Sequence, residues 1–132
     1  MSEAEVAAWV QRQLGYSRPF TDYAALGFGE PLVAGVVFHD WQPENGTIEL
    51  TVASTAPWAT RARLWAIGEY VGRHARLAVF KTSERNQRAL RLMKRLGAQM
   101  TIVPELRGPG EAEVVCTISH EGWYGLIAAK RA

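Results

Sequence analysis

The stretch K-T-S-E-R-N-Q-R-A-L-R-L-M-K-R-L-G-A, residues Lys81 to Ala98, decides the fold of this chain. It begins where an apolar run ends, crosses a polar turn and continues with apolar residues at helical spacing. Ser83 is predicted to cap this helix, and Glu84 follows where the helix dipole favours an anion. Gly97 supplies the left-handed residue that ends it. The stretch is therefore predicted to be a strand, a turn and an amphipathic helix.

Further helices and strands are predicted on both sides of this stretch. Helices are expected at residues 3 to 14 and from about 60 to 74. Strands are expected where apolar residues alternate or cluster, at 23–28, 32–38, 47–53, 76–81, 99–103 and 111–119. Proline and glycine indicate turns or loops at 39–46 and 104–110. This order predicts an α/β (α+β) fold, with a mixed, mostly antiparallel sheet of about six strands and helices on both faces.

Length and composition indicate a single domain over residues 1–132, with an N-terminal helix at 1–15 and a C-terminal tail at 122–132. No apolar run approaches the roughly 20 residues that span a bilayer, and the polar N-terminus lacks the basic region of a signal peptide. The single cysteine, Cys116, excludes an intrachain disulfide and fits a reducing compartment. We therefore expect a cytoplasmic protein that does not enter a membrane. The three histidines are scattered, so no metal site is expected.

The 81–98 stretch resembles the closing motif of the GCN5-related N-acetyltransferase (GNAT) family, in which N-x-x-A-x-x-L leads into a helix ending in L-G-F/A. The matching residues are Asn86, Ala89, Leu92, Leu96, Gly97 and Ala98. The predicted element order over residues 3–119 is also similar to the family's, without the strand that usually comes first. Residues 53–61, A-S-T-A-P-W-A-T-R, are similar to short phage and prophage members. The resemblance implies an acetyl-CoA-dependent N-acetyltransferase acting on an amine of a small molecule or a protein.

The resemblance also implies where coenzyme A would bind. Backbone groups of the third strand would hold the pantetheine and the thioester carbonyl, a loop before the second helix would hold the pyrophosphate, and the central helix would close the site. The residues so implied are Thr51, Val52, Ala53, Trp58, Ala59, Thr60, Arg61, Arg63, Asn86 and Arg88. The family's glycine pattern is not intact in the loop, where arginines either replace backbone donors or block the cradle. Asn86 reaches the pantetheine or caps the helix.

Two side chains are candidates for the base that deprotonates the acceptor amine. Glu49 is the first, because it projects from the third predicted strand on the face opposite Ile48 and Leu50. His39, near the end of a strand, is the second. The acid is harder to assign, because Met93 stands where many family members have a tyrosine. Cys116 lies in a Val-x-Cys-x-Ile pattern that is typical of a core position.

An alternative reading is a catalytically weak or inactive GNAT-like phage accessory module that binds nucleic acid or a protein partner. Ten basic residues between Arg61 and Arg95 favour it, since clustered positive charge attracts phosphates. The central helix has no aromatic residue, so stacking on single-stranded bases is not encoded there. Five tryptophans also suggest a homodimer formed through the last strand and the tail.

Overall fold

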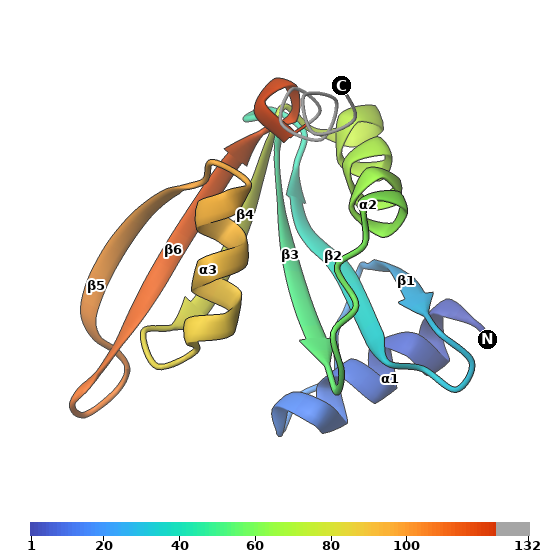
Figure 1. The fold of residues 1–132 in the computed structure, drawn as a ribbon, viewed down its shortest axis with the longest axis horizontal. Helices are drawn as coiled ribbons and strands as arrows, with labels where there is room; N and C mark the ends of the chain where they lie inside the picture. The colour runs from blue at the N-terminus through green and yellow to red at the C-terminus, as the bar shows by residue number, and fades with distance from the viewer. Residues whose placement is uncertain (124–132) are drawn as a thin grey trace.

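The computed structural model describes residues 1–123, which form a six-stranded sheet with helices on both faces (Figure 1). The elements are α1 (Glu3–Leu14), β1 (Ala24–Phe28), β2 (Ala34–Gln42), β3 (Thr47–Ser54), α2 (Arg61–His74), β4 (Leu77–Ser83), α3 (Gln87–Arg95), β5 (Gln99–Gly108) and β6 (Glu111–Ser119). The predicted order and fold class are confirmed, including the helix in place of a first strand. Most of the predicted tail, residues 124–132, lies outside the described residues.

The strands lie in the order β1-β2-β3-β4-β6-β5. Neighbouring strands are antiparallel except β3 and β4, which run parallel. A parallel pair needs a crossover connection, and α2 supplies it. The sheet is therefore mixed and mostly antiparallel, as predicted. No helix within residues 1–123 is long and apolar enough to cross a membrane.

Each face of the sheet has its own core. On one face Val6 and Val10 of α1 pack against Val37 of β2 and its neighbours in β1 and β3. On the other face α2 and α3 cover a larger cluster that includes Leu50 and Met93. The alternation of β3 places Ile48, Leu50 and Val52 at this larger core, as predicted from the period of two.

Gly35 lets α1 lie close to β2. A Cβ atom at this position would lie 2.6 Å from Cγ2 of Val10 and 3.1 Å from Cγ1 of Val6. Because valine side chains are stiff, Gly35→Ala is expected to lower the free energy of unfolding by about 1–3 kcal/mol, measured in urea. The double variant Gly35→Ala/Val10→Ala should lose less stability than the two single changes together. Strict additivity would contradict a steric clash with Val10.

The predicted start of the central helix is wrong. Asn86, not Ser83, is the N-cap of α3, and its side chain accepts a hydrogen bond from the backbone N–H of Ala89 (3.1 Å). Ser83 is the last residue of β4, which runs two residues beyond its predicted end, and its hydroxyl donates to the carboxylate of Glu111. The Glu84 carboxylate accepts from the backbone N–H of Ala112. Residues 83 and 84 therefore fasten the β4 end to β6.

Two further strands, β2 and β5, continue beyond their predicted ends. β2 continues through His39 to Gln42, because a register shift lets Gln42 pair with Thr47 and leaves only a short turn. β5 continues through Pro104 to Gly108, where a loop was predicted. Since β5 is an edge strand, the missing N–H of a proline is tolerated there, and the pairing with β6 shifts register beyond Val103.

Candidate functional site

The centre of the sheet opens where β3 and β4 separate (Figure 1). Their parallel pairing runs from Thr47 opposite Leu77 to Leu50 opposite Phe80 and goes no further. Beyond this point β3 stays paired with β2, and β4 stays paired with β6. Each strand therefore follows its antiparallel neighbour, and the backbone edges that face the gap are free to bond a ligand.

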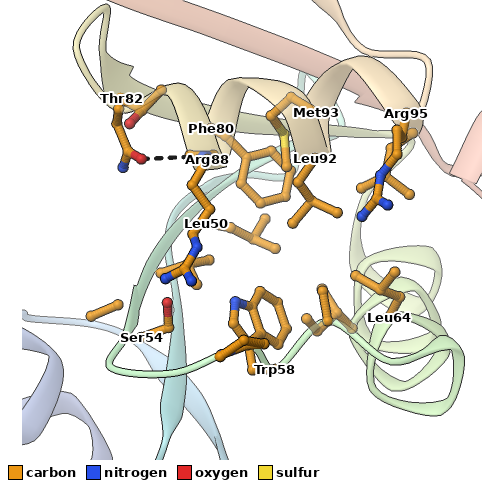
Figure 2. A pocket seen from close by; sticks show the side chains of 18 of the residues that line it. Leu50, Ser54, Trp58, Leu64, Phe80, Thr82, Arg88, Leu92, Met93 and Arg95 are labelled. Atoms are coloured by element: carbon orange, nitrogen blue, oxygen red, sulfur yellow. Dashed lines mark hydrogen bonds between the residues drawn. The ribbon is translucent and has the colours of Figure 1, made fainter.

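A cavity of about 480 Å³ lies at this opening (Figure 2). Its walls come from the separating strands, the 56–59 loop, α2, α3, Trp123 and the end of α1 at Gln13 and Leu14. Much of the lining is apolar: Leu50, Val52, Pro57, Trp58, Leu64, Ile67, Phe80, Leu92, Met93, Leu96 and Trp123. This volume is in the range of sites for small molecules and cofactors, and its walls suit a ligand with an apolar segment.

Two arginines of α3 and Lys81 of β4 bring positive charge to the cavity. Arg88 points towards Ser54 and Arg95 towards Leu64 (Figure 2). Neither arginine has an ion-pair partner within residues 1–123, and the described residues that line the cavity include no carboxylate. Positive charge that is not compensated attracts an anion. Arg95 was missed by the sequence analysis, although its spacing of two helical turns from Arg88 places both on one face.

The loop before α2 is only partly at the cavity. Trp58 and Ala59 line it, but Thr60, Arg61 and Arg63 are not among the described residues that do. Thr60 instead caps α2 by accepting from the backbone N–H of Arg63 (3.3 Å). The Arg63 guanidinium donates to the carbonyl oxygen of Trp58 (3.3 Å) and lies 5.5 Å from the ring centre of Phe28. Arg63 therefore stabilises the loop and neither lines nor blocks the cavity.

The other residues expected at the coenzyme are arranged around the opening. Val52 and Ala53 line the cavity, and Asn86 lines it while capping α3. Thr51 is the first β3 residue beyond the last pair with β4. Its side chain lies on the α1 face of the sheet, opposite the face of Leu50 and Val52. Asn86 can therefore cap α3 and also contact the pantetheine, because the cap uses its side-chain oxygen and its side-chain N–H groups can bond a ligand.

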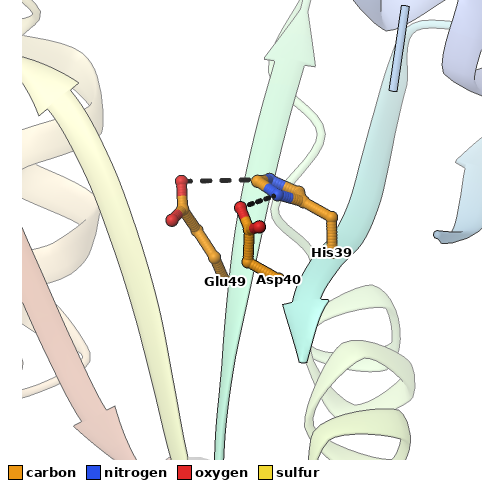
Figure 3. Close-up of side chains that lie close together, drawn as sticks. All are labelled: His39, Asp40 and Glu49. Carbon is orange, nitrogen blue, oxygen red and sulfur yellow. Dashed lines mark hydrogen bonds and ion pairs between the residues drawn. The ribbon is translucent and has the colours of Figure 1, made fainter. Parts of the chain in front are cut away.

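The two candidate bases come together on the α1 face of the sheet. Glu49 Oε2 lies 3.9 Å from His39 Nε2, and Glu49 Oε1 lies 3.2 Å from Lys81 Nζ. Asp40 lies at the other nitrogen of the same ring, 2.8 Å from Nδ1 (Figure 3). The closest ligand atoms of these three side chains lie within 4.8 Å of one another, as they would around one metal ion, although exposed acidic groups are common without one. Lys81 lines the cavity as well, so this cluster and the cavity meet at the strand opening.

No tyrosine is found among the described residues that line the cavity. Met93 lines it with 6% of its surface exposed. Cys116 is completely buried in the α2/α3 core, as its pattern predicted, and burial raises the pKa of its thiol. Neither side chain supplies a proton donor for a leaving thiolate.

The basic residues of the central stretch do not form one continuous surface. Lys81 pairs with Glu49, Arg85 pairs with Glu111 at 3.5 Å, and Arg88 and Arg95 line the cavity. A module that uses this helix as a nucleic-acid surface is therefore not favoured.

No protein-family model matches the chain, and no curated protein matches its sequence. Solved structures do match its fold. A GCN5-related N-acetyltransferase from Brucella melitensis is 16% identical with a TM-score of 0.67, and the match covers 97% of this chain and 63% of that protein. YncA from Salmonella typhimurium, assigned as an acetyltransferase and solved with its cofactor acetyl-CoA, is 16% identical with a TM-score of 0.67 and 91% of each chain covered.

A third match is a chimera of the spermidine N-acetyltransferase SpeG from Vibrio cholerae and hSSAT. It is 10% identical with a TM-score of 0.65, and the match covers 77% of this chain and 70% of that one. At such identities the likeness establishes the fold, which is that of the GCN5-related N-acetyltransferases. The narrower resemblance to phage sequences stays a prediction.

Proposed function

We propose that this chain, which has the GNAT fold, is an N-acetyltransferase that uses acetyl-CoA and acetylates a primary amine. The observation that carries this proposal is the opening between β3 and β4, with an apolar-walled, positively charged cavity beside it. Coenzyme A combines an extended amide-containing chain with phosphates, so it needs unpaired backbone groups, an apolar channel and cations together. YncA, which has the same fold, was solved with acetyl-CoA.

The residues divide by the part of the ligand that they would bind. Backbone groups of Val52 and Ala53, at the free edge of β3, would bond the pantetheine amides, and Trp58 and Phe80 of the cavity wall would flank the pantetheine. Cations on α3 would take the phosphates in place of the glycine-rich cradle that the loop lacks. The bound coenzyme would supply an acetyl thioester, whose C–S bond breaks as the amine nitrogen forms the C–N bond. The sulfur leaves with the bonding electrons, and the proton that the nitrogen loses on becoming an amide balances the one that the sulfur takes up.

Acetyl transfer is tested with a panel of amines of different chemistry. We suggest an aliphatic polyamine, an arylethylamine, a lysine-containing peptide and a peptide with a free N-terminus, each incubated with acetyl-CoA. The expected result is release of free thiol above the rate without protein, with a product heavier by one acetyl group in mass spectrometry. Binding of acetyl-CoA without transfer to any of these amines would restrict the proposal to coenzyme binding. Absence of both would overturn it. The predicted cytoplasmic location and homodimer stay predictions.

A further inference from the structure

His39 is held at both ring nitrogens. Its Nδ1 lies 2.8 Å from Oδ2 of Asp40, and its Nε2 lies 2.7 Å from Oγ1 of Thr51. The imidazole is mostly buried, with 12% of the side chain exposed, and the ring of Phe20 packs against it at a centroid distance of 5.4 Å. The ring therefore has a fixed position between a carboxylate and a hydroxyl.

These contacts determine which nitrogen of neutral His39 carries the proton. An ionised carboxylate only accepts hydrogen bonds, so Nδ1 must be the donor to Asp40. Nε2 is then the acceptor, and the Thr51 hydroxyl donates to it. The oxygen of Thr51 keeps a lone pair with which it can accept a proton from a further group. Asp40, His39 and Thr51 are therefore connected by hydrogen bonds, and a proton can pass from the Thr51 hydroxyl to the His39 ring.

Thr51 lies at the end of this hydrogen-bonded series that is nearest the opening in the sheet. It directly follows Leu50, the last β3 residue that pairs with β4, and its sequence neighbours Leu50 and Val52 line the cavity. An amine that attacks a carbonyl group held between the strands from the α1 face would approach close to the Thr51 hydroxyl. This placement rests on the proposed function, because it takes the thioester to lie in the opening.

Glu49, the first candidate base, is differently placed. One oxygen of its carboxylate is already engaged by the ammonium group of Lys81 at 3.2 Å. Its other oxygen faces His39 Nε2 at 3.9 Å, where it would stabilise an imidazolium. The charged groups around His39 are therefore Asp40 on its own strand, Glu49 on β3 and, through Glu49, Lys81 on β4.

We propose that Thr51 and His39 form a proton relay that deprotonates the acceptor ammonium, with Asp40 as a positioning residue. A proton of the ammonium passes to Oγ1 of Thr51 while the hydroxyl proton of Thr51 passes to Nε2 of His39. The nitrogen becomes a neutral nucleophile, and the positive charge moves to an imidazolium that Asp40 and Glu49 flank. Thr51 is the residue that contacts the acceptor.

The first test needs no acceptor. Nitrogen-15 NMR of the histidine rings in the free protein is expected to show His39 with its proton on Nδ1. Asp40→Asn should reduce this preference, and asparagine tolerates the left-handed backbone of Asp40, whose φ is 49°. Glu44→Gln, an exposed carboxylate in the same hairpin, should leave it unchanged. A neutral His39 protonated at Nε2 in the wild-type protein would overturn the relay.

The second test measures transfer to the best amine of the panel. Thr51→Val removes the hydroxyl at constant shape and should lower kcat by roughly 100-fold or more, in the range of general base catalysis, without changing acetyl-CoA affinity. Thr51→Ser should restore most of the rate. His39→Gln should remove the rise of kcat with pH. If Thr51→Val binds acetyl-CoA normally and keeps its kcat and pH profile, the relay is overturned and the proposed function stands. If the wild-type protein fails to bind acetyl-CoA, the proposed function itself is overturned.

Discussion

Reversing the charge of Arg88 or Arg95 is expected to weaken acetyl-CoA binding by about 10- to 100-fold for each residue. A hydrogen bond to a charged group contributes about 1.5–3 kcal/mol, and 1.4 kcal/mol corresponds to a factor of about ten in Kd. Both guanidinium groups line the cavity without a carboxylate partner within residues 1–123, so little other than a ligand compensates their charge. Isothermal titration of Arg88→Glu and Arg95→Glu with acetyl-CoA measures the loss.

The same helix provides matched controls. Arg91 and Lys94 are exposed residues of α3 and are not among those lining the cavity, so Arg91→Glu and Lys94→Glu change the net charge equally. Their acetyl-CoA affinity should stay close to that of the wild-type protein. If all four variants lose affinity equally, the long-range field of the helix attracts the ligand and the cavity does not bind its phosphates.

Replacing Trp123 with alanine is expected to lower the free energy of unfolding by about 3–5 kcal/mol, the range for truncation of a large buried aromatic. Trp123 is 2% exposed, its Nε1–H donates to the carbonyl oxygen of Leu64 in α2 at 2.8 Å, and its ring stacks on Phe80 of β4. It therefore joins α2 to β4, next to the point where β3 and β4 stop pairing. Gly68 leaves room for it, because a Cβ there would lie 2.6 Å from the indole.

Trp41 is the control for this change. Its Nε1–H also donates to a backbone carbonyl of α2, that of His74 at 2.9 Å, but half of its surface is exposed. Trp41→Ala should therefore cost about 1 kcal/mol, near the contribution of one hydrogen bond. Urea unfolding of both variants gives the comparison. Similar losses for the two tryptophans would contradict the bridging role of Trp123.

The period of apolar residues was sufficient to predict the elements and their order. Alternation in β3 and the helical spacing after Asn86 each reflect burial on one face, which depends on local sequence alone. The start of α3 was predicted wrongly because Ser83 and Asn86 are both good caps. The choice between them depends on β6. Ser83 stays in the sheet because its backbone pairs with Glu113 and its hydroxyl bonds the carboxylate of Glu111. That contact lies about 28 residues away in the chain and has no local signal.

The candidate site likewise depends on contacts between residues that are far apart in the sequence. Glu49 and His39 were selected separately from the sequence, and their proximity follows from the pairing of β2 with β3, which places them directly opposite each other. The roles of Asp40 and the Thr51 hydroxyl depend on side-chain directions that pattern does not give. The loop arginines were expected at the phosphates by analogy of position, yet Arg63 turns towards Phe28. Helical spacing from Arg88 would have been the better guide.

A crystal structure of the protein with acetyl-CoA would show directly whether the opening between β3 and β4 holds the coenzyme. We expect the pantetheine chain between residues 51–54 of β3 and residues 80–82 of β4, with its amides bonded to the free edge of β3 and phosphate oxygens within hydrogen-bond distance of Arg88 or Arg95. The thioester should lie beside Thr51. Coenzyme bound elsewhere, or an opening filled by protein side chains while the ligand is present in saturating amount, would contradict it.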